Sequence, residues 1–275
     1  MVLRRRLKVR LFLYLLAMVS AVVGGQQWVR RHVVFQPTHD ASDSIMQELQ
    51  FYRFSPLPDD DEKIGFRGFV YVPNVPQKVI VVFHGNTGQA ADRIYIGREL
   101  ADQNSVVLLA EYPGYGERPG SPSYKSLIES ALENITFLNE NFPDLPVILV
   151  GESLGSSVAI EAATHVPVSG LVLVSPFTSL RDVAALQLPP LPLQWLVTDP
   201  FDSQAALPRL KDTPLLVIHG KNDSLIPFPL GQKLFDLYTG PKEMLAISGK
   251  DHNDLPWDDP KSHMWLGIKD FLNTL

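Results

Sequence analysis

Residues 146–158 read P-V-I-L-V-G-E-S-L-G-S-S-V and combine the features of a buried strand, a tight turn and the start of a helix. Residues 147–150 are an unbroken apolar run between a proline and a glycine, which is typical of a strand covered on both faces. The motif G-x-S-x-G follows at once, with Ser153 at its centre. We expect Gly151 and Gly155 to be required there, because strand and helix must approach closely around a strained serine turn.

This turn brings Ser153 and the N-terminus of a helix together. It lifts the serine hydroxyl above the edge of the sheet and sets the free N–H groups of the helix beside an oxyanion formed at that serine. The pentapeptide also occurs by chance in loops rich in glycine and serine. Its position between a strand and a helix makes a nucleophilic serine the stronger interpretation.

The composition is that of a globular protein with a basic N-terminus. The chain has 275 residues, 45% hydrophobic and 20% charged, which predicts one α/β domain of ordinary size. Without the basic residues at positions 4, 5, 6, 8 and 10 the formal net charge changes from −6 to −11, so nucleic acid is not expected as a partner. There is no cysteine, which excludes disulfides, a thiol nucleophile and thiolate metal sites but permits export.

Residues 1–30 are predicted to be a signal peptide or a membrane anchor. Residues 1–10 are basic, and residues 11–23 are almost purely apolar. This run is short for a membrane span, which favours a signal peptide. Trp28 and the arginine pair at 30 and 31 are suited to anchoring a helix that is not cleaved.

Cleavage after Ala21 or Gly25 is possible, although neither is a strong cleavage site. The alternative is a buried helix of the soluble domain. The positive flank places the N-terminus in the cytoplasm and residues 31–275 on the other side of the membrane. We therefore expect a membrane-anchored or exported domain with its site on the non-cytoplasmic side.

Strand and helix patterns alternate along residues 31–275. Two β-type segments, residues 48–56 and 64–72, flank an acidic turn and predict an antiparallel hairpin. Buried strands are expected at residues 79–83, 106–111, 147–150, 171–174, 215–219 and 243–247, and helices at residues 92–104, 123–141 and 260–275. This order predicts an α/β fold with a largely parallel sheet covered by helices on both faces.

The alternation breaks between Pro176 and Pro214. Residues 188–196, L-P-P-L-P-L-Q-W-L, are apolar but rich in proline, so they cannot form a regular strand or a long helix. An insertion at about residues 181–210 lies above the carboxyl ends of the strands. We interpret it as a small apolar cap in which Trp195 contacts the substrate. The alternative is an insertion that only packs against the domain and has a structural role.

A serine hydroxyl becomes an effective nucleophile when a histidine takes its proton and a carboxylate orients that histidine. The histidines that follow Ser153 are His165, His219, His252 and His263. Only His252, in the loop after the last expected strand, can readily swing over the serine. The preferred acid is Asp223, which follows the preceding strand by a short turn; its rivals are Asp199, Asp202, Asp251 and Asp254.

The order serine, aspartate, histidine, with G-E-S-L-G, H-G-N-T-G, H-G-K-N-D and K-D-H-N-D each after a strand, resembles the serine-hydrolase branch of the α/β-hydrolase superfamily. The likeness covers nearly all of the chain from about residue 64. It is greatest to the membrane-associated α/β-hydrolase-domain proteins, which include lysophospholipid and monoacylglycerol lipases and protein depalmitoylases. This resemblance implies the α/β-hydrolase fold, with Ser153 as nucleophile, His252 as base and Asp223 as acid.

The resemblance also implies an oxyanion hole made by the backbone N–H groups of Asn86 and Leu154. The loop His84-Gly85-Asn86-Thr87-Gly88 departs from the lipase H-G-G-G form. The sequence therefore leaves open which backbone N–H group of this loop points toward the oxyanion. We interpret His84 as a structural residue that holds the loop. Neither a phosphate-binding G-K-[ST] nor a dinucleotide-binding G-x-G-x-x-G is present, and no metal or cofactor is required.

Together these features predict a serine hydrolase that cleaves ester or thioester bonds of small acyl esters or lipids through an acyl-enzyme. A serine peptidase would use the same triad, but the large propeller or cap usual in such peptidases has no room here. A dehalogenase would need a carboxylate in place of Ser153. A non-catalytic binding protein on this scaffold should lack at least one triad member, and all three are present.

Overall fold

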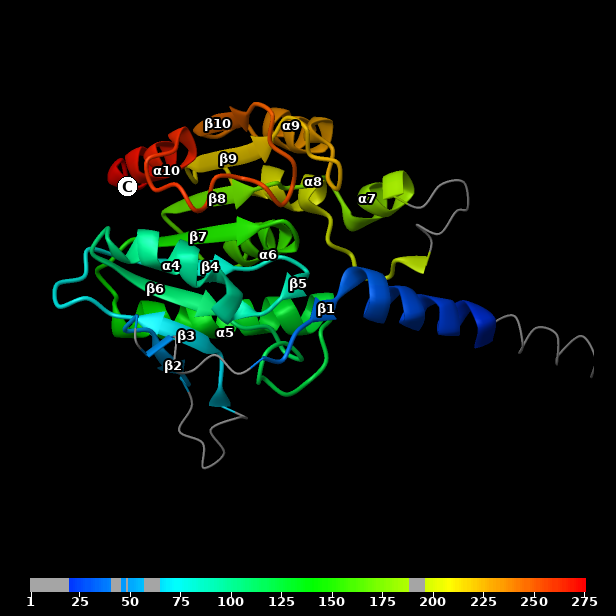
Figure 1. The fold of residues 1–275 in the computed structure, drawn as a ribbon, viewed down its shortest axis with the longest axis horizontal. Helices are drawn as coiled ribbons and strands as arrows, with labels where there is room; N and C mark the ends of the chain where they lie inside the picture. The colour runs from blue at the N-terminus through cyan, green and yellow to red at the C-terminus, as the bar shows by residue number, and fades with distance from the viewer. Residues whose placement is uncertain (1–19, 41–45, 48, 57–64, 188–195) are drawn as a thin grey trace, which may run out of the picture.

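The computed structural model, which describes residues 20–40, 46–47, 49–56, 65–187 and 196–275, is organised around an eight-stranded sheet of order β10-β9-β8-β7-β4-β6-β3-β2 (Figure 1). Strand β3 runs antiparallel to both β6 and β2, and the other neighbours are parallel. The predicted hairpin and the largely parallel sheet are thus confirmed. The strands are β2 (Tyr52–Phe54), β3 (Gly68–Tyr71), β4 (Lys78–Phe83), β6 (Ser105–Ala110), β7 (Val147–Glu152), β8 (Gly170–Val174), β9 (Leu215–Gly220) and β10 (Lys242–Ile247).

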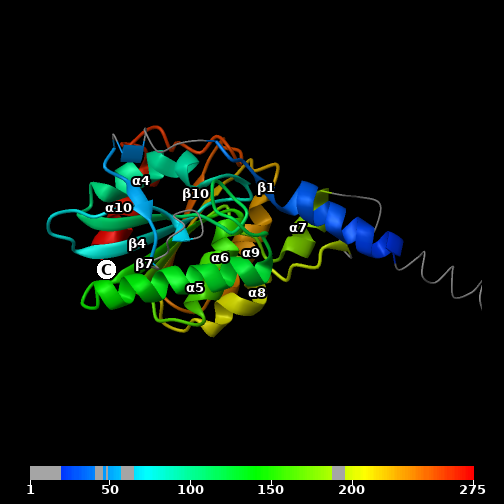
Figure 2. The ribbon, with the colours of Figure 1, turned by 90° about the horizontal axis from the view of Figure 1, so that it is seen from below.

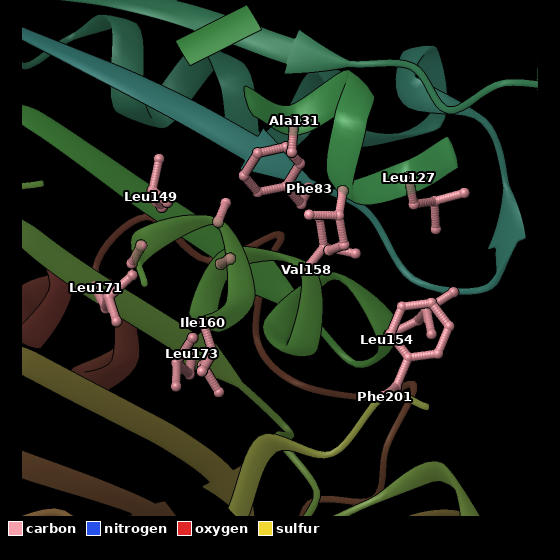
Figure 3. Close-up of a cluster of buried hydrophobic side chains, with 14 of the residues drawn as sticks. Phe83, Leu127, Ala131, Leu149, Leu154, Val158, Ile160, Leu171, Leu173 and Phe201 are labelled. Carbon is pink, nitrogen blue, oxygen red and sulfur yellow. The ribbon is translucent and has the colours of Figure 1, made fainter. Parts of the chain in front are cut away.

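Helices cover both faces of this sheet (Figure 2). The described helices that pack on it are α4 (Ile94–Ala101) and α10 (His263–Asn273) on one face, and α5 (Tyr124–Asn141), α6 (Leu154–Ala163) and α9 (Phe228–Leu237) on the other. Alternate residues of each strand enter the two layers: Val79 and Val81 of β4 face the layer of α5 and α6, and Ile80 and Val82 face that of α4 and α10. Figure 3 shows the first of these cores, with Val158 of α6 at its centre.

Helices α5 and α10 each begin at a serine that caps the helix N-terminus. Ser123 accepts a hydrogen bond from the Ser126 N–H at the start of α5, and Ser262 accepts one from the Trp265 N–H at the start of α10. The helix expected at residues 92–104 is found as the short 3₁₀ turn η2 (Ala90–Arg93) followed by α4. The remaining expected strands differ from the observed ones only at their ends.

A helix crosses the expected domain boundary at residue 30. Residues 20–29 are α-helical and continue into the π-helical turn η1 (Arg30–Val34). The strand β1 (Gln36–Pro37) then pairs in parallel with β5 (Thr87–Gly88) in a separate two-stranded sheet (Figure 1). Over the part of the chain that is described, no helix has the length and apolar character needed to cross a membrane. Residues 1–19, which hold most of the predicted apolar segment, lie outside the described residues.

An insertion joins β8 to β9, at the position where the cap is predicted. It contains α7 (Leu180–Gln187), the short helix α8 (Ser203–Ala206) and the 3₁₀ turn η4 (Leu207–Arg209). The helix α7 and the N-terminal helix project from the same end of the domain (Figures 1 and 2). Trp195 and the rest of residues 188–195 lie outside the described residues, so the substrate contact of Trp195 stays a prediction.

Candidate active site

Ser153 lies in the strained turn that the sequence predicts. Its backbone angles are φ 52° and ψ −115°, a region that residues other than glycine rarely adopt. The turn joins β7 to α6, and the Ser153 N–H donates to the Val174 carbonyl at 2.8 Å. A methyl group at Gly155 would lie 2.0 Å from the Phe83 carbonyl oxygen, and one at Gly151 would lie 2.4 Å from the Gly155 carbonyl oxygen. The expectation that both positions must be glycine is confirmed.

The three side chains singled out as a triad meet at the carboxyl ends of three parallel strands. Ser153 follows β7, Asp223 follows β9 and His252 follows β10. Nε2 of His252 lies 3.2 Å from Oγ of Ser153, and Nδ1 of His252 lies 2.8 Å from Oδ2 of Asp223. The side chain of Asp223 has no exposed surface and that of His252 is 8% exposed. The carboxylate can therefore orient the imidazole toward the serine hydroxyl without competition from water.

Asp223 is held as a charged carboxylate. Its Oδ1 accepts the N–H groups of Leu225 and Ile226 at 3.0 and 2.7 Å. Burial alone disfavours the charge, but hydrogen bonds from His219, His252 and the Ile226 N–H, together with the charge of His252, hold the pKa of Asp223 well below its usual value. An acid that stays ionised is the form that can stabilise a protonated histidine.

The loop that follows β4 is held in place by hydrogen bonds of the His84 ring. Nδ1 of His84 donates to the Gly85 carbonyl at 2.8 Å, and Nε2 lies 3.1 Å from Oε1 of Glu111. Both side chains are 1% exposed. The Tyr112 hydroxyl donates to the His84 carbonyl at 2.9 Å. These contacts agree with the expectation that His84 holds this loop.

The two residues expected to form an oxyanion hole, Leu154 and Asn86, both border the cavity at Ser153. Leu154 is the first residue of α6, so its N–H has no carbonyl partner within the helix. Asn86 ends the loop that follows β4, and it borders the same cavity as Ser153 and Leu154. An oxyanion formed at Ser153 would lie at a helix N-terminus, where negative charge is stabilised.

A cavity of about 350 Å³ opens beside Ser153. Its walls are mostly apolar, and most of the apolar side chains come from three parts of the chain. The insertion contributes Phe177, Leu180, Val183, Ala184 and Val197, the N-terminal segment contributes Val33 and Val34, and the loop after Asp223 contributes Leu225 and Ile226. Among the described residues, no three histidine, aspartate or glutamate side chains are grouped so as to hold a metal ion.

Comparison with known proteins places the chain in a family. A family model described as "Serine aminopeptidase, S33" matches residues 74–201. An uncharacterized protein of Mycobacterium tuberculosis is 34% identical over 197 residues, which cover 71% of this chain and 70% of that protein. A structure of an esterase from Pyrococcus furiosus has the same fold, with a TM-score of 0.71 over 89% of this chain and 99% of that chain at 18% identity. The chain belongs to the α/β-hydrolase superfamily.

Two further similar proteins bear lipase names. The lysophosphatidylserine lipase ABHD12 of Xenopus tropicalis is 29% identical over 180 residues, which cover 58% of this α/β-hydrolase but only 46% of the relative. A monoacylglycerol lipase structure from Paleococcus ferrophilus covers 82% of this chain and 98% of that chain, with a TM-score of 0.58 and 19% identity. The second likeness shows the fold alone.

His219 makes a contact with Asp223 that sequence reasoning did not assign. It is fully buried at the end of β9, and its Nε2 lies 3.3 Å from Oδ2 of Asp223 and 2.9 Å from the Ile226 carbonyl oxygen. Asp223 therefore faces two histidines. The spacing of four residues in H-G-K-N-D is the sequence signal that places both side chains at one strand end.

The four rival carboxylates make other contacts. Oδ2 of Asp199 lies 3.3 Å from Nε of Arg30, and Asp202 caps the N-terminus of α8. Asp251 accepts hydrogen bonds from Ser224, and the Asp251 N–H donates to Asp254. Of the five candidates, Asp223 is the carboxylate bonded to the ring of His252.

We expect Gly155→Ala to lower the free energy of unfolding by more than about 3 kcal/mol or to prevent folding. The added methyl group would meet the Phe83 carbonyl on a central strand that cannot move away. Gly24→Ala is the control, because a methyl group there has no neighbour within 4 Å. Urea unfolding followed by circular dichroism measures both; equal stability of the two variants would contradict the close approach of α6 and β4.

The lowered pKa of Asp223 predicts a pH-dependent stability. The unfolded chain takes up the proton of this carboxyl at about pH 3.9, and the folded protein takes it up at lower pH. The stabilisation is therefore complete above about pH 5 and is lost as the pH falls through the folded pKa. At neutral pH, Asp223→Asn should be less stable than the wild type by about 1–2 kcal/mol, and the difference should shrink toward pH 3 in urea unfolding experiments. A difference that stays constant over this range would refute the shift.

Proposed function

We propose that the protein is a serine hydrolase that cleaves carboxylic ester or thioester bonds through an acyl-enzyme, with Ser153 as nucleophile, His252 as base and Asp223 as orienting acid. The observation that carries this proposal is the unbroken line of hydrogen bonds from Asp223 Oδ2 through the His252 ring to Ser153 Oγ. The order of the three groups and their distances are those of nucleophile, base and orienting acid in acyl transfer.

In this mechanism Oγ of Ser153 attacks the acyl carbonyl while Nε2 of His252 accepts the hydroxyl proton. The N–H groups of Asn86 and Leu154 receive the oxyanion of the tetrahedral intermediate. His252 then gives its proton to the leaving alcohol or thiol, and the acyl-enzyme forms. Water, activated by His252, attacks the acyl-enzyme in turn and releases the carboxylic acid. Asp223 stabilises the imidazolium in both acylation and deacylation.

The walls of the cavity favour an acyl chain as the bound group. Its described lining is dominated by aliphatic side chains of the insertion and the N-terminal segment and includes no charged side chain. The name lysophosphatidylserine lipase, borne by a protein similar in sequence, supports lipid-like acyl esters as substrates. The basic and apolar N-terminal segment would hold the domain at a membrane, on its non-cytoplasmic side, or direct its export.

The description of the matching family favours a second candidate, an aminopeptidase. Such an enzyme must bind the protonated α-amino group of its substrate beside the scissile bond, and a buried ammonium group needs a carboxylate partner. The described cavity lining offers no aspartate or glutamate. We therefore prefer the esterase, and comparing an aminoacyl p-nitroanilide with a p-nitrophenyl ester distinguishes the two.

Ser153→Ala and His252→Ala should each lower kcat for short acyl esters by at least about three orders of magnitude, and Asp223→Ala somewhat less, because the triad acts as a unit. Asp202→Asn is the matched control, since asparagine still caps α8. A p-nitrophenyl butyrate assay and labelling by a fluorophosphonate probe measure the losses. Wild-type activity in Ser153→Ala, or a larger loss in Asp202→Asn than in Asp223→Ala, would overturn the assignment.

The apolar cavity predicts a preference for longer acyl chains. Each methylene that enters it contributes about 0.8 kcal/mol, so kcat/KM for p-nitrophenyl esters should rise from two carbons upward until the cavity is filled. Val183→Trp, on α7, should fill part of the cavity and move the optimum to shorter chains. If the wild type prefers acetate and Val183→Trp does not change that preference, the proposal of a lipid-like substrate is contradicted. The protein would then be a general esterase.

A further inference from the structure

The segment that follows the N-terminal helix is bonded to the loop of Asn86. Strand β1 pairs with β5, and the Gln36 N–H donates to the Asn86 carbonyl at 2.9 Å (Figure 1). The Tyr115 hydroxyl donates to the same carbonyl at 2.7 Å. Side chains add two contacts: Thr87 Oγ1 donates to Gln36 Oε1 at 3.2 Å, and Asn86 Nδ2 donates to the Val33 carbonyl at 3.4 Å. Groups outside the loop thus hold the Asn86 carbonyl from two sides.

These bonds restrict the direction of the Asn86 N–H. The two donors fix the peptide that follows Asn86, and the His84 bond to the Gly85 carbonyl fixes the peptide that precedes it. The N–H of Asn86 belongs to the preceding planar peptide, so its direction is set once both peptides are fixed. An oxyanion hole is effective when its donors are aimed before the reaction begins. Gln36 supplies one of these restraints through its backbone.

The same segment forms one wall of the cavity beside Ser153. Val33 and Val34 line it together with Leu154, across from the insertion. Val34 is 5% exposed and belongs to the main core, so this wall is packed against the domain. An acyl chain in the cavity would contact these valines directly.

The N-terminal helix is docked firmly enough for this role. Val29 and Phe35, on either side of η1, are 3% and 1% exposed, and the Phe35 ring packs edge-on against Phe201. Between them, Arg30 is paired with the nearly buried Asp199 of the insertion. The segment is thereby fixed at both ends to the sheet and to the insertion.

We propose that residues 33–36 are part of the active site: the backbone of Gln36 is a positioning element for the Asn86 N–H, and the side chains of Val33 and Val34 form a specificity wall for the acyl chain. This inference rests on the proposed esterase function. It extends that function to a segment next to the predicted signal peptide or anchor, which the comparison with the matching family does not reach because that match begins at residue 74.

Gln36→Pro and Gln36→Ala test the positioning role. Both remove the side chain, but only proline removes the N–H that bonds the Asn86 carbonyl. With p-nitrophenyl acetate, Gln36→Pro should lower kcat about tenfold more than Gln36→Ala, with little change in KM. Its affinity for a trifluoromethyl ketone, whose adduct carries the oxyanion, should fall in parallel. The pH profile of kcat should have the same shape in the two variants, because neither substitution changes a titratable side chain. Equal kcat and equal inhibitor affinity in the two variants would refute the positioning role.

Val33→Trp tests the specificity wall, and this test remains valid even if Gln36→Pro does not fold. It should lower kcat/KM for p-nitrophenyl dodecanoate at least about tenfold relative to butyrate, because the indole fills space that a long chain needs. Val75→Trp is the matched control, since Val75 is 73% exposed in the loop before β4, at the opposite ends of the strands. A dodecanoate-to-butyrate ratio in Val33→Trp equal to that in Val75→Trp would refute the wall.

The wild type separates this inference from the proposed function. If the wild type neither hydrolyses any ester of the series nor reacts with a fluorophosphonate probe, the proposed function fails and the inference fails with it. If the wild type is active and the two pairs of variants behave alike within each pair, the inference alone is overturned.

Discussion

The close approach of helix α6 to strand β4 is the contact on which the site depends. Gly155 of α6 lies against the Phe83 carbonyl of β4, with no room for a side chain. This approach holds Ser153 at φ 52° and ψ −115°, a sparsely populated conformation that costs of the order of 1–3 kcal/mol for a residue other than glycine. The burial of α6, whose Val158 and Ile160 have no exposed surface, more than offsets that cost (Figure 3).

The parallel direction of the strands accounts for the convergence of the candidate site. Loops that are remote in the sequence leave the sheet at one edge, so Ser153, Asp223 and His252 meet without any of them being neighbours in the chain. Each strand end is set by the ladder of β7, β8, β9 and β10, which gives the side chains little freedom. This rigidity favours a reaction that needs a hydroxyl, an imidazole and a carboxylate in line.

Much of this site was predictable because each motif stands directly after a buried strand. The run at residues 147–150 and the G-x-S-x-G turn give the elbow, and the loop positions of Asp223 and His252 follow from the order of strands. The contact of His219 with Asp223 and the docking of residues 29–38 were not predictable. Strand β1 has two residues and pairs with a partner about fifty positions away, so neither periodicity nor propensity reveals it. The sequence did not predict helix α7 for a different reason: the helix is short and precedes a proline-rich segment.

The pairing of His84 with Glu111 restricts which substitutions the loop can accept. Both nitrogens of His84 face acceptors, the Gly85 carbonyl and the Glu111 carboxylate, and Glu111 also accepts the N–H groups of Ala90 and Tyr112. Replacing one member would leave the other buried without its partner. A substitution at either position is therefore expected to require a compensating change at the other.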